Sequence, residues 1–214
     1  MQTFVGPIGY DSTRVTRPVL RHGVTNGDTI RLLHPERPED DEDARAQEAI
    51  TDVERMIGEL EPSVTVESLP TPTDPFEETL DECLGALDDV DGELVVILGG
   101  GVREIYFPLG LAAVTRQEQV DATLQYSDLD GSVQEIDLPP VGTDIGDSVE
   151  STLIAIVDAE RVSLADLARE LDPSKSTISR HLDTLEDAHF VTTSYEGKSK
   201  VVEPTRRGKL YLEF

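Results

Sequence analysis

The sequence predicts an α/β protein with two domains: a mostly parallel, doubly wound sheet, then a smaller domain of helices and one hairpin. Two observations support the first domain. Apolar strand patterns alternate with helical patterns over residues 1–138. The strand at 93–98 contains Leu94-Val95-Val96-Ile97-Leu98, a continuous apolar run typical of a central parallel strand. A third observation, the proline- and glycine-rich segment 139–147, marks a linker before residues 148–214.

The elements of the first domain follow one another in regular alternation. Strands are expected at residues 3–8, 29–33, 64–69 and 93–98. Helices are expected at residues 12–22, 40–60, 75–87 and 103–115. A hairpin of residues 122–126 and 133–138, turning at 128–131, closes the domain. This alternation is typical of a Rossmann-like sheet with helices on its faces.

Apolar residues at helical spacing predict which helix faces pack on the sheet. The first helix is expected to bury Val15, Val19 and Leu20. Cys83 falls in a helical pattern and is expected to be a small core residue rather than a nucleophile. The long acidic helix carries an apolar stripe formed by Ala46, Ala49, Ile50, Val53 and Ile57.

The C-terminal segment 162–202 has the pattern of a winged helix-turn-helix. Ser163 begins a short helix, and Asp166 completes an S-x-x-D capping box. Asp172-Pro173 marks the turn, because proline disfavours helix in the residue before it. A second helix, at 174–188, buries Ile178, Leu182 and Leu185. Strands at 190–195 and 198–203, joined at Glu196-Gly197, form the wing.

The exposed face of the second helix has the chemistry that DNA requires. It carries short polar groups and a fork-shaped cation, which suit base edges and phosphates, while the wing lysines suit the DNA backbone. The alternative is a helical hairpin that only packs or dimerises. The residues expected to contact double-stranded DNA are Ser174, Lys175, Ser176, Thr177, Ser179, Arg180, Lys198 and Lys200.

The charge distribution separates the two domains. The chain has 44 acidic and 18 basic residues and a net charge of −26. Residues 148–214 hold 12 acids and 9 bases, including all four lysines, so most of the negative charge lies in residues 1–147. Cations are therefore concentrated in the domain expected to bind DNA. The abundant acids, few lysines and absent tryptophan are typical of a protein from a salt-rich cytoplasm; an acidic surface for basic partners is the competing explanation.

Several other classes of protein are disfavoured. No apolar run approaches the ~18 residues that span a bilayer, and the start lacks a cationic signal-peptide region, so a cytoplasmic protein is expected. One cysteine allows no internal disulfide. The four histidines are scattered, so we expect no metal site and no cofactor.

Two glycine-rich loops follow strands of the expected sheet: Gly6-Pro7-Ile8-Gly9-Tyr10-Asp11 and Gly99-Gly100-Gly101-Val102-Arg103. Ligands of open parallel sheets bind beyond the carboxyl ends of the strands. A helix N-terminus after such a loop favours an anion, and Arg103 adds donors suited to phosphate. The loop matches neither G-x-x-x-x-G-K-[ST] nor G-x-G-x-x-G, which disfavours a Walker-type ATPase and a dinucleotide-dependent dehydrogenase. A tight turn with Arg103 paired to a carboxylate is the alternative.

Taken together, these motifs resemble a known family. The loop Gly9-Tyr10-Asp11, the loop Gly100-Gly101-Val102-Arg103 and the run STISRHLDTLEDAHFV are similar to those of archaeal CRISPR-associated Rossmann-fold (CARF) transcriptional regulators with a C-terminal winged helix. Val102 stands where the family often has Thr or Met, and Gly99 is an additional glycine.

The resemblance implies a homodimer that binds a cyclic oligoadenylate, usually the tetramer, on its two-fold axis and regulates CRISPR-associated genes. Cyclic tetra-adenylate is thus the expected effector ligand. The residues that the resemblance places around it are Ile8, Gly9, Tyr10, Asp11, Gly99, Gly100, Gly101, Val102 and Arg103.

Two other functions remain open. A ring nuclease would degrade the cyclic oligoadenylate, and Ser12 and Thr13 lie near the expected pocket with Asp11 as the sole evident base. We expect no enzymatic activity and assign no catalytic residue. A winged-helix regulator that responds to another small nucleotide or small molecule is the second alternative.

Overall fold

The computed structural model describes residues 1–36, 41–88, 90, 92–171, 174–197 and 199–213. Two compact units make up the chain, Met1–Leu138 and Pro139–Phe214. The expected turn at Asp172-Pro173 and the wing residue Lys198 lie outside the described residues. No helix in the described part of the chain is long and apolar enough to cross a membrane.

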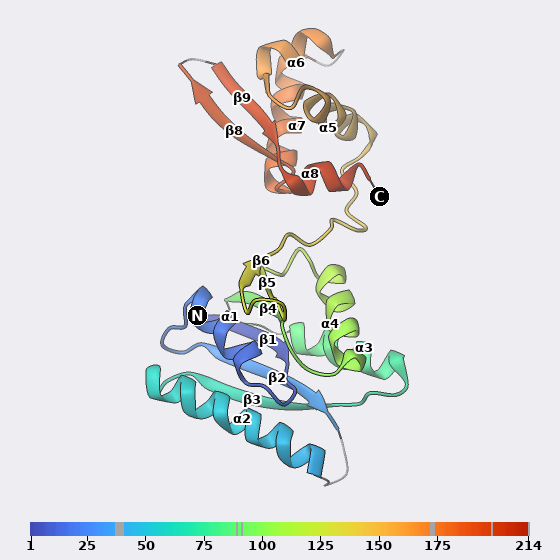
Figure 1. The fold of residues 1–214 in the computed structure, drawn as a ribbon. Helices are drawn as coiled ribbons and strands as arrows, with labels where there is room; N and C mark the ends of the chain where they lie inside the picture. Colours follow the sequence, from blue (N-terminus) through green and yellow to red (C-terminus); the bar gives the residue numbers. More distant parts are fainter. Residues whose placement is uncertain (37–40, 89, 91, 172–173, 198, 214) are drawn as a thin grey trace. The chain divides into compact units, whose positions relative to one another are not determined.

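A six-stranded sheet forms the centre of the first unit (Figure 1). Its strands lie in the order β3-β2-β1-β4-β5-β6, and every neighbouring pair is parallel except β5 and β6. The prediction of a mostly parallel, Rossmann-like sheet is therefore confirmed. The strands are β1 (Gln2–Pro7), β2 (Thr29–Pro35), β3 (Thr65–Thr71), β4 (Glu93–Leu98), β5 (Ala122–Tyr126) and β6 (Val133–Glu135).

The last strand is shorter than predicted. We expected it to run to residue 138, but β6 ends at Glu135. The antiparallel register pairs Glu135 with Leu124, only two residues from the start of β5 at Ala122. Little of the partner strand therefore remains for the residues after Glu135.

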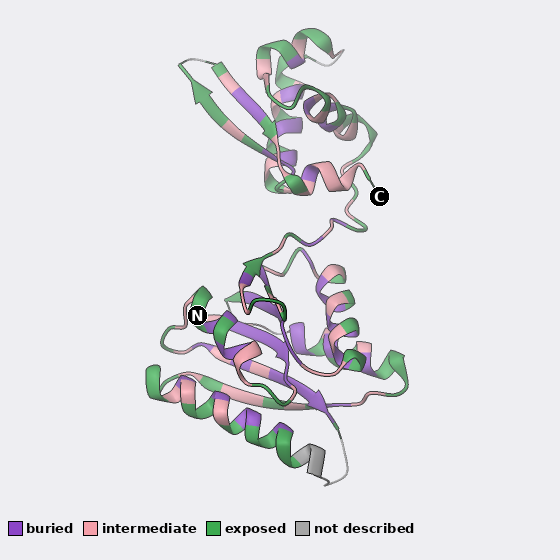
Figure 2. Ribbon diagram, in the orientation of Figure 1, coloured by how far each residue is buried: buried purple, intermediate pink, exposed green. Residues whose placement is uncertain are grey.

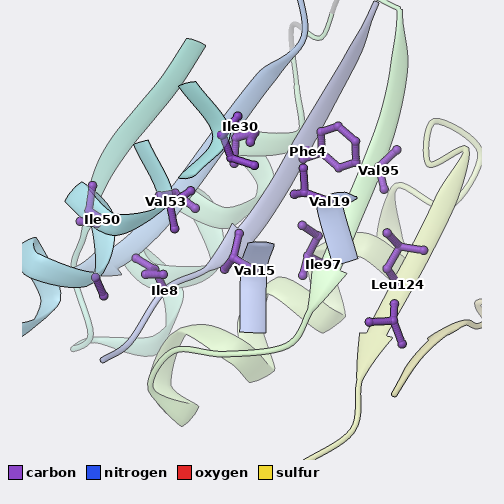
Figure 3. Packing of buried hydrophobic residues seen from close by; sticks show 14 of the residues in the cluster. Phe4, Ile8, Val15, Val19, Ile30, Ile50, Val53, Val95, Ile97 and Leu124 are labelled. Carbon is purple, nitrogen blue, oxygen red and sulfur yellow. The ribbon is translucent and has the colours of Figure 1, made fainter. Parts of the chain in front are cut away.

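Helices cover both faces of the sheet, two on each face (Figure 1). On one face, α1 (Thr13–His22) and α2 (Asp41–Leu60) enclose the core shown in Figure 3. On the other, α3 (Phe76–Leu87) and α4 (Arg103–Thr115) lie side by side. The central strand β4 is buried from Leu94 to Leu98, as its continuous apolar run predicts (Figure 2).

The helix faces agree with the prediction except at one residue. The predicted stripe of α2 is buried throughout. In α1, Val15 and Val19 are buried, but Leu20 is 40% exposed and Pro18 is buried in its place. Leu20 follows Val15 by five residues, which turns it away from the stripe, whereas Pro18 follows by three. Cys83 is fully buried, and burial, with the nearby charge of Glu82, raises the pKa of its thiol to about 12.

The second unit packs its helices against a small antiparallel sheet of order β7-β9-β8. The two predicted helices and the hairpin are present, and the buried Ile178, Leu182 and Leu185 are in its core. Helices α5 and α8, which we did not predict, complete that core. The elements are α5 (Asp147–Ala159), β7 (Val162–Ser163), α6 (Leu164–Glu170), α7 (Lys175–Asp187), β8 (Val191–Glu196), β9 (Ser199–Pro204) and α8 (Arg206–Tyr211).

Candidate ligand loops and nucleic-acid interface

The strand order brings the two glycine loops together. β1 lies between β2 and β4, and the helices that follow β1 and β4 pack on opposite faces of the sheet. This is the switch point of a doubly wound sheet, where a crevice opens beyond the carboxyl ends of the strands. The loop of residues 8–12 follows β1 and the loop of residues 99–102 follows β4, so both lie at this end of the sheet.

Close backbone contacts explain the glycines of the second loop. A Cβ atom on Gly99 would lie 2.3 Å from the carbonyl oxygen of Arg14, and one on Gly101 would lie 2.6 Å from Cβ of Pro7. Gly101 also has a φ of +78°, which L side chains rarely adopt. A Cβ on Gly9 would lie 3.4 Å from the Gly101 backbone. The glycine run, which the sequence suggested would admit a ligand, is thus also required for the loops to pack.

Arg103 is the exposed first residue of α4. In the described part of the chain, no ion pair or hydrogen bond engages its guanidinium group, so the predicted alternative of a carboxylate partner does not occur there. The N-cap residue of α4, Val102, provides no side-chain hydrogen bond. The first amide groups of α4 and the Arg103 side chain are therefore donors that an anion could use, although Glu104 opposes it in the same turn.

The first loop carries a carboxylate and an aromatic ring. Asp11 accepts a hydrogen bond from the Thr13 amide (3.0 Å) and lies 3.6 Å from the Arg14 guanidinium. Partial burial favours a higher pKa for Asp11, but the hydrogen bonds from Thr13 and the Arg14 charge outweigh it, so the pKa is lowered. The Tyr10 ring is 44% exposed, and the Arg45 guanidinium lies 4.4 Å from its centroid. Tyr10 thus offers a partly exposed aromatic surface in the loop after β1.

The turn between β5 and β6 contacts helix α1, next to the loop after β1. The sequence patterns did not connect this turn with the candidate site. Arg14 Nη2 lies 3.2 Å from the carboxylate of Asp128, and Arg17 donates to the carbonyl of Gly131 (3.0 Å). Both contacts join α1 to the turn between β5 and β6. The turn at 128–131 was predicted, but its position depends on strand order, which no local pattern encodes.

The N-terminus of α7 gathers three of the predicted DNA-binding residues. Ser174 caps the helix by accepting a hydrogen bond from the Thr177 amide (3.3 Å). Its hydroxyl also lies 2.8 Å from the Ser176 hydroxyl and 3.0 Å from the Thr177 hydroxyl. Lys175 and Arg180, on the same helix, are exposed. The predicted polar face of this helix is therefore at the surface.

A groove of about 740 Å³ lies between α7 and the β8–β9 hairpin. Three predicted residues, Lys175, Ser179 and Lys200, meet there, whereas Ser176, Thr177 and Arg180 do not line it within the described residues. Two acids, Asp183 and Glu196, lie in the same groove. The described residues that line it are Leu164, Ala165, Lys175, Ser179, Asp183, Tyr195, Glu196, Ser199 and Lys200.

Carboxylates that the sequence patterns did not indicate form ion pairs at the hairpin, in addition to its apolar packing on the core. Glu186 on α7 lies 3.6 Å from the Lys200 ammonium group, whose side chain is only 17% exposed. Arg161, just before β7, pairs with Glu196 (2.5 Å) and Glu203 (3.2 Å) on the two hairpin strands. Lys200 was predicted to reach DNA from the wing, but in this structure it is paired within the domain. No local sequence signal links residue 186 to residue 200.

Comparisons with known families match both units. The family model of the Csa3 CRISPR-associated Rossmann-like domain matches residues 2–136. The model of bacterial regulatory proteins of the arsR family matches residues 160–193. No curated protein sequence matches the chain.

Two solved structures are similar to parts of the chain. Csm6 of Enterococcus italicus, bound to cyclic hexa-2′-fluoro-hexa-dAMP, has a TM-score of 0.53 at 12% identity over 89% of this chain and 56% of its own. A MarR mutant from E. coli, complexed with operator DNA, has a TM-score of 0.31 at 19% identity over 33% of this chain and 53% of its own. The chain thus spans about half the length of each of these two proteins.

Proposed function

Since the chain belongs to the Csa3 CRISPR-associated Rossmann-like family and carries a winged helix-turn-helix, we propose that it is a CRISPR-associated transcription regulator that senses a cyclic oligoadenylate. One observation carries the proposal. The β1 and β4 loops meet at the switch point of the sheet, with Arg103 exposed beside them, in a chain whose other unit has a helix-turn-helix. The first unit would bind the ligand, and the second would bind double-stranded DNA in the cytoplasm.

The ligand-binding residues suit a ring of phosphates and bases. Arg103 and the first amides of α4 supply donors for a phosphate, and the exposed ring of Tyr10 supplies a surface on which a base can stack. We propose cyclic tetra-adenylate as the effector. The Csm6 structure holds a cyclic hexanucleotide analogue. A binding experiment should therefore compare cyclic tetra-adenylate with cyclic hexa-adenylate.

A ligand with two-fold symmetry would be shared by two copies of the chain, and the outer face of α4 supports such a homodimer. Phe107 is 59% exposed and Leu111 is 37% exposed, and both follow Arg103 at helical spacing. The exposed Phe76 ring of α3 lies 6.1 Å from that of Phe107. Between Glu104 and Arg116, α4 has no charged residue. Two molecules of net charge −26 would approach most readily through such an uncharged face.

Cleavage of the ring is the second candidate function, and the state of Asp11 argues against it. A general base works best when its pKa lies near the working pH. The pKa of Asp11 is instead lowered by Thr13 and Arg14, so its carboxylate is a weak proton acceptor. We therefore propose that the protein binds the ring without cleaving it.

Calorimetry tests the ligand site. Wild-type protein should bind cyclic tetra-adenylate with a stoichiometry of one ring per dimer. Arg103→Ala should weaken binding by about 10- to 150-fold, because a charge-assisted hydrogen bond is worth about 1.5–3 kcal/mol. Arg21→Ala, in the last turn of α1, is the control and should bind normally. Chromatography of labelled ligand should show an intact ring. Wild-type affinity in Arg103→Ala would remove this loop from the site.

A further inference from the structure

One carboxylate ties both strands of the wing to α7. Glu186 accepts a hydrogen bond from the Thr193 hydroxyl on β8 (Oγ1 to Oε1, 2.7 Å). Its other oxygen lies 3.6 Å from Nζ of Lys200 on β9. The Lys200 side chain is only 17% exposed, whereas that of Glu186 is 43% exposed. The hairpin packs on the core of α7 through Val191 and Val202, and Glu186 adds a polar link to both strands that water and ions can reach.

The pair removes positive charge from the groove in which DNA is expected. Among the described residues that line the groove, Lys175 and Lys200 are the cations and Asp183 and Glu196 are the acids, so their formal charges cancel. With Lys200 paired to Glu186, Lys175 is the groove cation that has no ion-pair partner among the described residues. Of the groove cations that the structure describes, a phosphate approaching the DNA-free domain would therefore meet Lys175 unpaired and Lys200 already paired.

We propose that Glu186 is a positioning residue that keeps Lys200 paired until DNA binds. In the DNA-free protein Glu186 neutralises Lys200, and in the complex a DNA phosphate replaces Glu186 as the partner of the ammonium group. This inference rests on the proposed DNA binding by the winged helix. Glu186 keeps its hydrogen bond with Thr193 throughout. The wing therefore stays in contact with α7 while Lys200 changes its partner.

The energies of the two partners favour this exchange. A partly exposed ion pair contributes little stability, so its loss is a small cost. Duplex DNA carries one negative charge per ~1.7 Å of its axis, and neutralising phosphates releases condensed counterions. The flexible four-carbon stem of lysine allows its ammonium group to move between acceptors. Because Glu186 competes with phosphate for Lys200, its charge lowers affinity for DNA of every sequence.

Glu186→Gln tests the inference, because glutamine retains an acceptor for Thr193 and removes only the charge. On a duplex of unrelated sequence in 0.1 M KCl, the variant should bind about two- to fivefold more tightly than wild type, the range expected for one exposed pair. The slope of log affinity against log salt should steepen by up to about one unit. Asp187→Asn is the matched control: it removes the same charge from the neighbouring exposed residue and should bind like wild type.

A double-mutant cycle isolates the role of Lys200. Lys200→Met should weaken binding to all duplexes equally, and in its background Glu186→Gln should have no effect. The inference is overturned by unchanged or weaker binding of Glu186→Gln, by an equal gain in the Lys200→Met background, or by an equal gain in Asp187→Asn. If wild type binds no duplex at all, the proposed DNA-binding function fails and the inference fails with it. If wild type binds and Glu186→Gln does not respond, only the inference fails.

Discussion

The loops at the switch point and the groove beside the wing are held in place by different forces. Gly99 and Gly101 pack directly on the backbone and on Pro7, where a side chain has no room. The wing strands pack on the core through Val191 and Val202, and their outer polar side chains form ion pairs, of Glu186 with Lys200 and of Arg161 with two glutamates. Steric packing is insensitive to salt, whereas exposed ion pairs are screened by it. The difference suggests that one chain combines a candidate ligand site fixed by steric packing with a candidate DNA site whose surface charges can change partners.

The largest effect is expected at the sterically fixed loop. Gly99→Ala places a Cβ 2.3 Å from the Arg14 carbonyl oxygen, so the free energy of unfolding of the first unit should fall by about 3 kcal/mol. Gly110→Ala is the control: a Cβ there meets nothing within 4 Å, and alanine in helix α4 should stabilise by up to about 1 kcal/mol. Urea denaturation measures both. Equal stabilities would show that steric packing does not fix this loop.

The outer face of α4 should provide the next largest effect. Phe107→Asp should weaken the dimer by about 2 kcal/mol, roughly thirtyfold, because a charge replaces an apolar contact. Sedimentation should show monomers at concentrations where wild type is dimeric, in low and in high salt alike. Gln119→Asp, an exposed position outside the helix, should leave the dimer intact. A Phe107→Asp protein that sediments as a dimer would place the interface elsewhere.

Substitutions in α7 and in the wing should separate base contacts from phosphate contacts. Arg180→Ala and Ser179→Ala should each cost about 1–3 kcal/mol on the operator and less on unrelated DNA, if the helix reads bases. Lys198→Ala and Lys200→Ala should weaken all sequences about equally. Fluorescence anisotropy on both kinds of duplex measures these effects. A change of sequence preference in the lysine variants would contradict the assignment of base readout to α7.

The smallest effect concerns pH. His181 is buried in the second unit and shares a hydrogen bond of 2.8 Å with Thr152, and burial together with the charge of Arg180 lowers its pKa. The unfolded chain therefore takes up a proton more readily, so the stability present above pH ~6.5 is progressively lost as the pH falls below it. Thermal unfolding from pH 7.5 to 5 should show this loss in wild type. In His181→Gln it should be smaller; an identical loss would assign the pH dependence to other groups.

Local patterns predicted most of the fold. The apolar run of β4 and the stripe of α2 were sufficient because burial imposes a periodicity that the sequence displays. The capping serine Ser163 marked the start of α6 for the same local reason, and the structure shows that Ser174 caps α7 in the same way. Helix α5 was not predicted, although Leu153 and Ile156 are fully buried, because its short apolar run at 153–157 does not distinguish a helix from a strand.

The candidate sites were only partly predictable. The two glycine loops could be found because each follows a recognisable strand. The contacts of Arg14 with Asp128 and of Glu186 with Lys200 could not, because they depend on strand order and hairpin register rather than on spacing in the sequence. The glycines themselves have a packing role that only the structure reveals.

The claim that the first unit controls the second is tested most directly by thermodynamic linkage. Operator affinity should be measured with and without cyclic tetra-adenylate, and ligand affinity with and without operator, in molar KCl. There the screening length is only ~3 Å, so long-range charge effects are suppressed. We predict that the ligand changes operator affinity and that the operator changes ligand affinity by the same factor, because linkage is reciprocal. No change in either direction would contradict the account.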